Sequence, residues 1–282
     1  MTRSVLIFAN CQGEELRTTA RYLTCLTGVT DFKWIASHKV TDADWAMRYG
    51  PDFMADVAVV WEQVESGQES AHRAALHRGL PKDVQIIRFP PFSALCLWPF
   101  SGNDPRQATD PTRYPWPDSI AAVLATEDLP DNAMFERYLE ITAQRMPDLE
   151  RRLRFDLARW RATDAIADIK VADWVERNFR AKRLFYTAGH VTAEPTRFLL
   201  NQLLSRTAFI DGALAARAAL EIEVLLRYHA GQDFECVPLH PLVAERLALQ
   251  FHDPNRLYRW HGHEWTLRQY ILRYIRWAPY LD

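Results

Sequence analysis

Cys11 is the first side chain of this sequence whose type and position favour chemistry. It follows the apolar run Val5–Ala9 and precedes a segment with helical periodicity. Unpaired N–H groups and the helix dipole favour negative charge at a helix start, so we expect this thiol to lose its proton more readily than a free cysteine. The same N–H groups could stabilise an oxyanion on a carbonyl that the sulfur attacks. The alternative is a packing role, because cysteine is often buried.

His190 repeats this arrangement, because an apolar run at Leu184–Thr187 precedes it and a helical pattern follows from near Glu194. If that run is a strand of the same sheet, His190 lies on the same edge as Cys11. A thiol beside an imidazole is the minimum machinery of thiol catalysis, with the imidazole as general base. Thr187 stands three residues before His190, so no local carboxylate orients the ring. The alternative is a loop histidine satisfied by backbone groups.

Polar side chains near these two residues are candidates for binding substrate or an oxyanion. Asn10, Gln12 and Gly13 flank Cys11, and Gln63 ends the apolar run of a middle strand. His240 could line the same cleft. Gln63 could instead cap a neighbouring loop, and His240 could cap the turn before Pro241.

The other cysteines give no indication of a metal centre or a disulfide framework. Cys25, Cys96 and Cys236 are far apart and lack CxxC spacing. His261 and His263 alternate near tryptophan, but no grouped cysteines complete a zinc site. We therefore expect reduced thiols in a cytoplasmic protein without a bound metal.

Composition excludes several classes of partner. The 282 residues hold 34 Lys plus Arg and 36 Asp plus Glu, a formal charge of −2, which gives no reason to expect nucleic acid. No apolar segment approaches the roughly 20 residues of a membrane span. Nothing in the sequence indicates an oligomeric state.

Periodicity predicts an α/β fold with a parallel sheet and flanking helices. Apolar runs typical of strands lie at Ser4–Ala9, Phe32–Ser37, Asp56–Trp61, Val84–Phe89 and Leu184–Thr187. An amphipathic helix is expected over Glu14–Leu26. We expect one domain over residues 1–282, with a loop rich in proline and aromatic residues at 89–118, a helical insertion at about 119–180 and a helical C-terminal region.

Several segments together resemble one known family. They are "ANCQG", "ADVAVVWEQV", "IIRFPPF", "YPWPDS", "KVADWVERNFRAKRLFYTAGHVT" and "VPLHPLVAERLAL", in that order. This succession, from roughly Val5 to Leu249, resembles the WcbI-type acetyltransferases of bacterial capsule polysaccharide biosynthesis. By position, Cys11 matches the motif cysteine and His190 the motif histidine. Ala9 stands where the family usually has Gly, and Val191 where it usually has Pro.

The resemblance implies an SGNH-hydrolase-like or flavodoxin-like fold, coenzyme A binding and acetylation of a sugar hydroxyl. The partners would be acetyl-CoA and a sugar or glycan acceptor. Arg17, Arg88 and Arg113 are candidates for binding the phosphates of coenzyme A. Either Cys11 attacks the thioester, or His190 activates the sugar directly. The alternatives are an esterase acting on acylated glycans and a non-catalytic protein that binds nucleotide or glycan.

Overall fold

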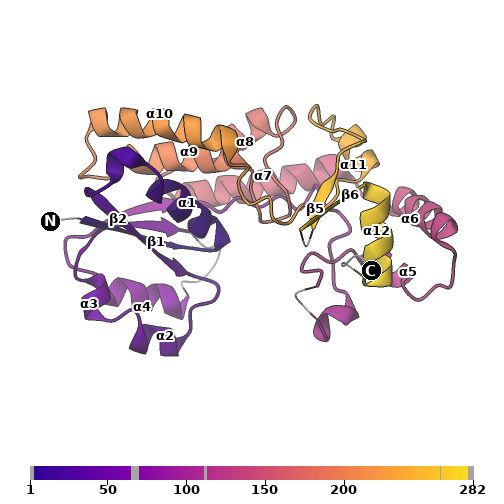
Figure 1. The fold of residues 1–282 in the computed structure, drawn as a ribbon, viewed down its shortest axis with the longest axis horizontal. Coiled ribbons are helices and arrows are strands. Elements are labelled where there is room, and N and C mark those ends of the chain that lie inside the picture. The colour runs from indigo at the N-terminus through magenta and orange to yellow at the C-terminus, as the bar shows by residue number, and fades with distance from the viewer. Residues whose placement is uncertain (1–2, 65–69, 111–112, 261, 279–282) are drawn as a thin grey trace. The chain divides into compact units, whose positions relative to one another are not determined.

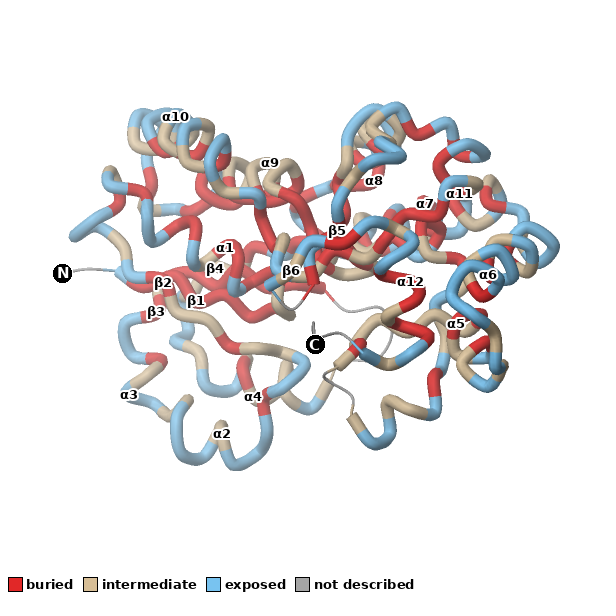
Figure 2. The backbone as a smooth tube through the Cα atoms, turned by 45° about the vertical axis from the view of Figure 1, so that its right-hand side comes forward, coloured by how far each residue is buried: buried red, intermediate tan, exposed pale blue. Residues whose placement is uncertain are grey.

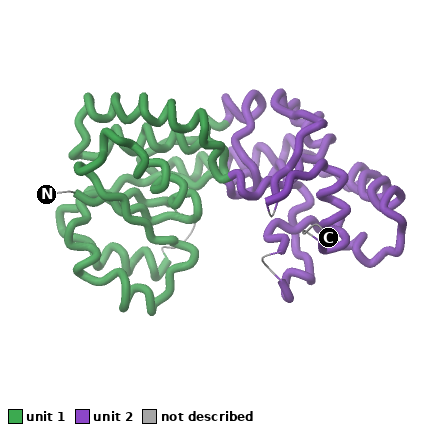
Figure 3. The backbone as a smooth tube through the Cα atoms, viewed as in Figure 1, with its two compact units in different colours: residues 1–92, 159–175, 191–232 green, residues 93–158, 176–190, 233–282 purple. Residues whose placement is uncertain are grey.

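The chain divides into two compact units in a computed structural model that describes residues 3–64, 70–110, 113–260 and 262–278. Unit 1 comprises residues 1–92, 159–175 and 191–232, and unit 2 comprises residues 93–158, 176–190 and 233–282 (Figure 3). The expectation of one domain over residues 1–282, with an insertion at about 119–180, stays a prediction beside this division.

A four-stranded parallel sheet forms the centre of unit 1 (Figure 1). Its strands are β1 (Arg3–Ala9), β2 (Thr30–Ala36), β3 (Val57–Gln63) and β4 (Gln85–Phe89), in the order β2-β1-β3-β4. The first four predicted strands and the α/β class are thereby confirmed. The order is that of the flavodoxin-like doubly wound sheets, which bind ligands where the carboxyl ends of β1 and β3 meet. We call this place the switch point.

Helices cover both faces of this sheet, which explains why β1 is buried along almost its whole length (Figure 2). Unit 1 holds α1 (Cys11–Arg21), α2 (Asp42–Met47), α3 (Pro51–Met54), α4 (Ala71–Gly79), α9 (Ala193–Leu204) and α10 (Gly212–Tyr228). On one face, Leu6 and Phe8 pack against apolar side chains of α3 and α4. The first helix begins at Cys11 rather than at the expected Glu14. It ends at Arg21, and a separate 3₁₀ turn, η1, spans Thr24–Leu26.

The expected strand at Leu184–Thr187 is wrong. No named strand covers this segment, and the sheet of the described residues has no fifth strand. Instead the chain turns back, because the N–H of Tyr186 donates to the carbonyl of His190 and the N–H of His190 donates to Thr187 Oγ1. Leu184 is buried within unit 2. The run Leu184–Thr187 is therefore apolar because it is buried in a turn, and not because it pairs in a sheet.

Unit 2 is mainly helical, as the sequence predicts for the middle and C-terminal regions. It contains the 3₁₀ turn η2 (Pro105–Ala108), α5 (Ser119–Leu124), α6 (Asp131–Arg145), α11 (Pro241–Arg246), the hairpin β5 (Tyr258–Trp260) and β6 (His263–Trp265), and α12 (Leu267–Arg276). Helices α7 (Leu149–Ile166) and α8 (Ala172–Asn178) contribute residues to both units. The sequence pattern did not predict the hairpin.

Aromatic side chains dominate the core of unit 2. Tyr114, which comes from the proline-rich loop, stacks on Trp260 of β5 with ring centroids 5.5 Å apart. Tyr270 and Tyr274 of α12 contact the ring of Tyr114 edge-on. Tyr114 thereby anchors its part of the loop in the core of unit 2. None of the described helices combines the length and apolar composition that crossing a membrane requires.

Candidate active site

Cys11 is the first residue of α1, directly after the carboxyl end of β1. Asn10 caps the helix: its side-chain oxygen accepts the N–H of Gln12 at 2.9 Å, and its carbonyl accepts the N–H of Gly13 at 2.9 Å. Asparagine is among the best N-cap residues because its side chain satisfies an otherwise unpaired donor. The run Asn10-Cys11-Gln12-Gly13 thus turns a strand into a helix with the thiol at the turn.

Side-chain amides join the ends of β1 and β3 at the switch point. The N–H of Asn10 donates to Gln63 Oε1 at 3.1 Å, and Gln63 Nε2 donates to Gln12 Oε1 at 3.3 Å. Gln12 also exchanges two hydrogen bonds with the backbone of Phe92, at 2.6 and 3.0 Å. Asn10, Gln12 and Gln63 are therefore brought together as one buried network, which holds the backbone on both sides of Cys11.

Gln232 also contacts the cysteine, although no motif in the sequence singles it out. Its Nε2 donates to the carbonyl of Cys11 at 3.0 Å, while its Oε1 accepts the N–H of Val191 at 3.1 Å. The adjacent Gly231 has φ +89°, and a Cβ there would lie 2.6 Å from the backbone of Thr192. Gly231 was therefore the one local feature of the sequence that indicated a close approach between two backbone segments beside Gln232.

Gly13 is required because α1 packs closely on the sheet. A Cβ at this position would lie 2.7 Å from Ala9 Cβ, 2.9 Å from Trp34 Nε1 and 3.1 Å from Ile7 Cγ2. Trp34 in turn donates to the carbonyl of Ala9 at 3.1 Å. The geometry gives Gly13 a packing role, in which it sets how deeply the start of α1 enters the switch point.

Burial raises the pKa of the Cys11 thiol, so the expectation of a lowered pKa is wrong. The hydrogen bond from Gln232, the nearby N–H groups and the charge of Lys39 lower it, but they do not outweigh the loss of solvent around a half-buried sulfur. The helix terminus acts in the expected direction and is the smaller effect. Cys11 is therefore a neutral thiol at neutral pH.

His190 belongs to unit 2, where it is buried among aromatic rings. The rings of Trp116 and Phe234 lie 5.1 and 4.8 Å from the imidazole, centroid to centroid. Burial lowers the pKa of His190 to about 4, so the ring is neutral at pH 7 and able to accept a proton. Because Cys11 lies in unit 1, the pairing of sulfur and imidazole stays a prediction.

Glu235 supplies the carboxylate that the sequence lacked near His190. Its Oε2 lies 3.7 Å from His190 Nδ1 and accepts the indole N–H of Trp116 at 2.7 Å. Burial alone accounts for the lowered pKa of His190, and a carboxylate at this distance would stabilise the imidazolium once it forms. Glu235 is 45 residues from His190 in the chain, and no spacing rule would have selected it.

His240 is the N-cap residue of α11, and its ring connects the start of this helix to α6. Its Nδ1 accepts the N–H of Leu242 at 3.1 Å, so the proton of the neutral ring lies on Nε2, which donates to Thr142 Oγ1 at 2.9 Å. Burial lowers the pKa of this imidazole to about 4 as well. Both ring nitrogens are engaged, which favours the capping alternative. A role in binding substrate stays a prediction.

A family comparison identifies the group to which these features belong. The profile described as "Polysaccharide biosynthesis enzyme WcbI" matches residues 4–210, which include both Cys11 and His190. The chain belongs to the WcbI family. The fold and family that the sequence motifs indicated are thus confirmed, and the family is one of enzymes of polysaccharide biosynthesis.

A solved WcbI structure is similar over nearly the whole chain. The two chains have a TM-score of 0.68 and 18% sequence identity, covering 98% of this chain and 90% of that one. That structure is described as native WcbI without a disulfide bond between coenzyme A and one of its cysteines. No curated protein matches the present chain.

The three arginines predicted to bind coenzyme A lie in different surroundings in this WcbI-family chain. Arg88 pairs with the buried Glu62, with Nε 3.2 Å from Oε2, and Arg113 pairs with Asp110 at 2.8 Å. Arg17 is half-buried on α1 and makes no ion pair with any described residue. Of the three, Arg17 is the one whose guanidinium stays available on the helix that Cys11 begins.

The described residues of this WcbI-family chain contain no group of three or more His, Cys, Asp or Glu side chains placed to hold a metal ion. His261, one of the two alternating histidines, lies outside the described residues.

Proposed function

We propose that this WcbI-family protein transfers a short acyl group, such as acetyl, from a coenzyme A thioester to a sugar hydroxyl. The observation that carries the proposal is the position of Cys11 at the switch point of a doubly wound sheet, where such folds bind their ligands. The similar solved structure supports it, because its description mentions coenzyme A together with a cysteine. Membership in a polysaccharide biosynthesis family supports a sugar as acceptor.

In the first step the Cys11 sulfur attacks the thioester carbonyl. A new S–C bond forms, the bond from that carbon to the sulfur of coenzyme A breaks, and coenzyme A leaves as a thiol after gaining a proton. Because burial keeps Cys11 protonated at neutral pH, its proton must leave as the attack proceeds. The N–H groups of Gln12 and Gly13 are already paired with Asn10, so we assign the N–H of Cys11 to the oxyanion.

His190 is the base of this proposal. It accepts the thiol proton and passes it to the departing sulfur of coenzyme A, which leaves the ring neutral again. In the second step it takes the proton of the sugar hydroxyl that attacks the acyl-cysteine, and that proton returns to the Cys11 sulfur as the ester leaves. A pKa of about 4 keeps the ring neutral and able to accept a proton. The Glu235 carboxylate stabilises the imidazolium once it forms. Arg17 is the residue we assign to a phosphate of coenzyme A.

Intact-mass spectrometry after exposure to acetyl-CoA tests the sulfur chemistry. We expect wild-type protein to gain one acetyl group, and we expect Cys11→Ser to lose that gain. Cys25→Ser is the matched control, because Cys25 is another half-buried free thiol of unit 1. An acetyl group that persists in Cys11→Ser and disappears in Cys25→Ser would contradict the proposal.

Calorimetric titration with coenzyme A and a product assay test the remaining steps. Absence of coenzyme A binding to wild-type protein would contradict the proposal even if an adduct turned over too fast to detect. With acetyl-CoA and a sugar panel, an acetylated sugar indicates a transferase, whereas free acetate alone indicates a hydrolase. His190→Ala should retain coenzyme A binding and lose transfer.

A further inference from the structure

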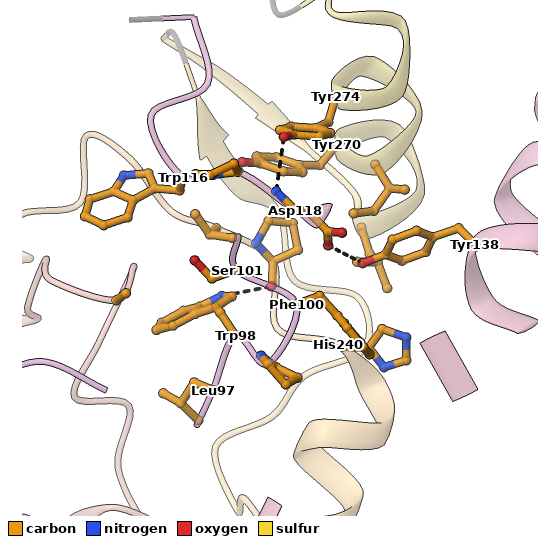
Figure 4. A pocket seen from close by; sticks show the side chains of 17 residues that line it. Leu97, Trp98, Phe100, Ser101, Trp116, Asp118, Tyr138, His240, Tyr270 and Tyr274 are labelled. Atoms are coloured by element: carbon orange, nitrogen blue, oxygen red, sulfur yellow. Dashed lines mark hydrogen bonds between the residues drawn. The ribbon is translucent and has the colours of Figure 1, made fainter. Parts of the chain in front are cut away.

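A cavity of about 50 Å³ lies within unit 2, and no predicted function accounts for it. A single buried water molecule needs a cavity of about 10–15 Å³. This cavity therefore has room for a group of roughly three to five non-hydrogen atoms. Its wall comes from the proline-rich loop, from α6, from α12 and from the segment before α11 that ends at His240 (Figure 4).

The aromatic residues of the wall differ in how far they are exposed. Trp98, Phe100 and Trp116 are half-exposed, whereas Tyr138 and Tyr270 are buried. Half-exposed indole rings give flat apolar surfaces that suit the C–H face of a sugar ring. The buried rings leave a narrower apolar space for a substituent that projects from that ring.

Most polar atoms of this wall already have partners. Tyr138 donates its hydroxyl to Asp118 Oδ2 at 2.8 Å, and Tyr274 donates to Asp104 Oδ2 at 2.7 Å. The indole N–H of Trp98 donates to the carbonyl of Pro238 at 3.1 Å. The wall is therefore satisfied on these sides and has no need of a ligand there.

Tyr270 is the exception. Its side chain is 2% exposed, and its hydroxyl finds no hydrogen-bond partner within the part of the chain that the structure describes. The ring extends from α12 toward the side of Trp116 (Figure 4). A buried hydroxyl without a partner costs free energy comparable to a lost hydrogen bond, so this donor calls for an acceptor from a bound molecule.

The cavity adjoins the imidazole that we propose as base. Trp116 lines the cavity and also packs against His190, with ring centroids 5.1 Å apart. Ala188, two residues before His190, lines it as well. The cavity and the imidazole therefore share Trp116 as a common neighbour.

Size, polarity and charge together select the substituent. A methyl group would leave the Tyr270 hydroxyl unpaired, and a hydroxyl would fill only part of the space. An anionic group would meet the carboxylate of Asp118 among apolar walls, which is unfavourable. We propose that the cavity binds the acetamido group of an N-acetylated amino sugar, with its carbonyl accepting the Tyr270 hydroxyl and its methyl among the rings. The role of this sugar as acyl acceptor rests on the proposed function, but its binding does not.

Ligand-observed NMR with free sugars tests this inference on the full chain without acetyl-CoA. The probes are N-acetylglucosamine, N-acetylgalactosamine and N-acetylmannosamine, each compared with its parent hexose. We expect saturation transfer to be strongest at the acetamido methyl of at least one probe, and we expect Tyr270→Phe to weaken its binding about tenfold. Tyr114→Phe is the matched control, because Tyr114 is another buried tyrosine of unit 2 whose hydroxyl has no partner among the described residues, and it does not line the cavity.

Equal binding of N-acetylated and parent sugars would overturn the inference, as would equal effects of Tyr270→Phe and Tyr114→Phe. The two proposals can fail separately. If Cys11 gains an acetyl group and no amino sugar binds, only the acetamido site is wrong. If the amino sugar binds through Tyr270 and Cys11 does not react with acetyl-CoA, the site holds and the acyl transfer is wrong.

Discussion

At the scale of single residues, Cys11 combines two effects that are usually considered apart. Its place at the start of α1 favours the thiolate, as at other helix N-termini, and the amide of Gln232 adds to that. Loss of solvent disfavours the thiolate and is the larger effect, so the pKa is raised. The consequence is a sulfur that needs a base at the moment of attack.

Alkylation kinetics measure that balance directly. Iodoacetamide reacts with thiolates, so we expect the rate at Cys11 to rise with pH along a curve whose midpoint lies above the value of a free thiol, about 8.5. Mass spectrometry of peptides, with Cys11→Ser as the reference for assignment, follows this site alone. A midpoint below that of a free thiol would show that the helix terminus outweighs burial.

Glu62 is a second residue whose surroundings decide its role. It is 1% exposed on β3, and its carboxylate contacts Arg73 Nε at 2.9 Å, His77 Nε2 at 3.0 Å and Arg88 Nε at 3.2 Å. The guanidinium Nη2 of Arg73 also donates to the carbonyl of Gln63 at 2.6 Å. The cluster thus supports the strand end from which Gln63 reaches the backbone of Asn10.

Removing the Glu62 charge should destabilise the protein by about 3 kcal/mol, because Glu62→Gln leaves neighbouring guanidinium groups partly buried without a counter-charge. The free energy of unfolding in urea measures this loss. Asp56→Asn is the control: Asp56 pairs with Lys33 at the surface, so its loss should cost less than about 1 kcal/mol. Equal costs for the two variants would show that the Glu62 cluster is a solvated surface network.

At the scale of elements, the contact between α1 and the sheet depends on Gly13. We expect Gly13→Ala to destabilise the protein by about 1–3 kcal/mol, because the added methyl group overlaps Ala9 and the indole of Trp34. A lowered midpoint of thermal unfolding would show it. Gly212→Ala is the matched control, since Gly212 is also in the first turn of a helix and a Cβ there meets nothing within 4 Å. An unchanged midpoint for Gly13→Ala would mean that α1 shifts outward freely.

The same elements show what local sequence can predict. The four strands were recognisable because each contains a short apolar run between helical or turn-rich segments. The run is most continuous in β1 and β3, which are buried along most of their length. Leu184–Thr187 has the same pattern and is no strand, because turns in a core also need apolar side chains. Asn10 was recognisable as a candidate for the same local reason, because it adjoins Cys11 in the sequence, whereas its role as the cap of α1 was not predicted.

The rest of the site depends on contacts between distant parts of the chain. Gln232 reaches Cys11 across 221 positions, and Glu235 reaches His190 only after the chain has passed through α9 and α10. The pKa of Cys11 also depends on the folded chain. The helix terminus that lowers this pKa can be predicted from the sequence, whereas the burial that raises it cannot. Tyr270 could not be selected from the sequence, because the feature that marks it is a hydroxyl without a partner among the described residues of the folded chain.

At the scale of the whole molecule, stability should depend on pH through buried neutral histidines. His240 is held neutral because its Nδ1 accepts the N–H of Leu242, and a second proton would replace that acceptor with a donor. Its pKa is about 4 in the folded protein and about 6.5 in an unfolded chain. Between these values the unfolded chain binds a proton that the folded protein excludes, so stability falls as pH falls through this window.

Replacing His240 by asparagine tests this dependence without removing the helix cap. Asparagine can accept the N–H of Leu242 as an N-cap residue, but it does not titrate. We expect wild-type protein to lose about 2 kcal/mol more than His240→Asn between about pH 7.5 and about pH 5, measured as the free energy of unfolding in urea. His190 has a lowered pKa in both proteins, so its contribution cancels in the comparison. Parallel losses in the two proteins would show that His240 is protonated at little cost, and hence that its bond to the start of α11 is dispensable.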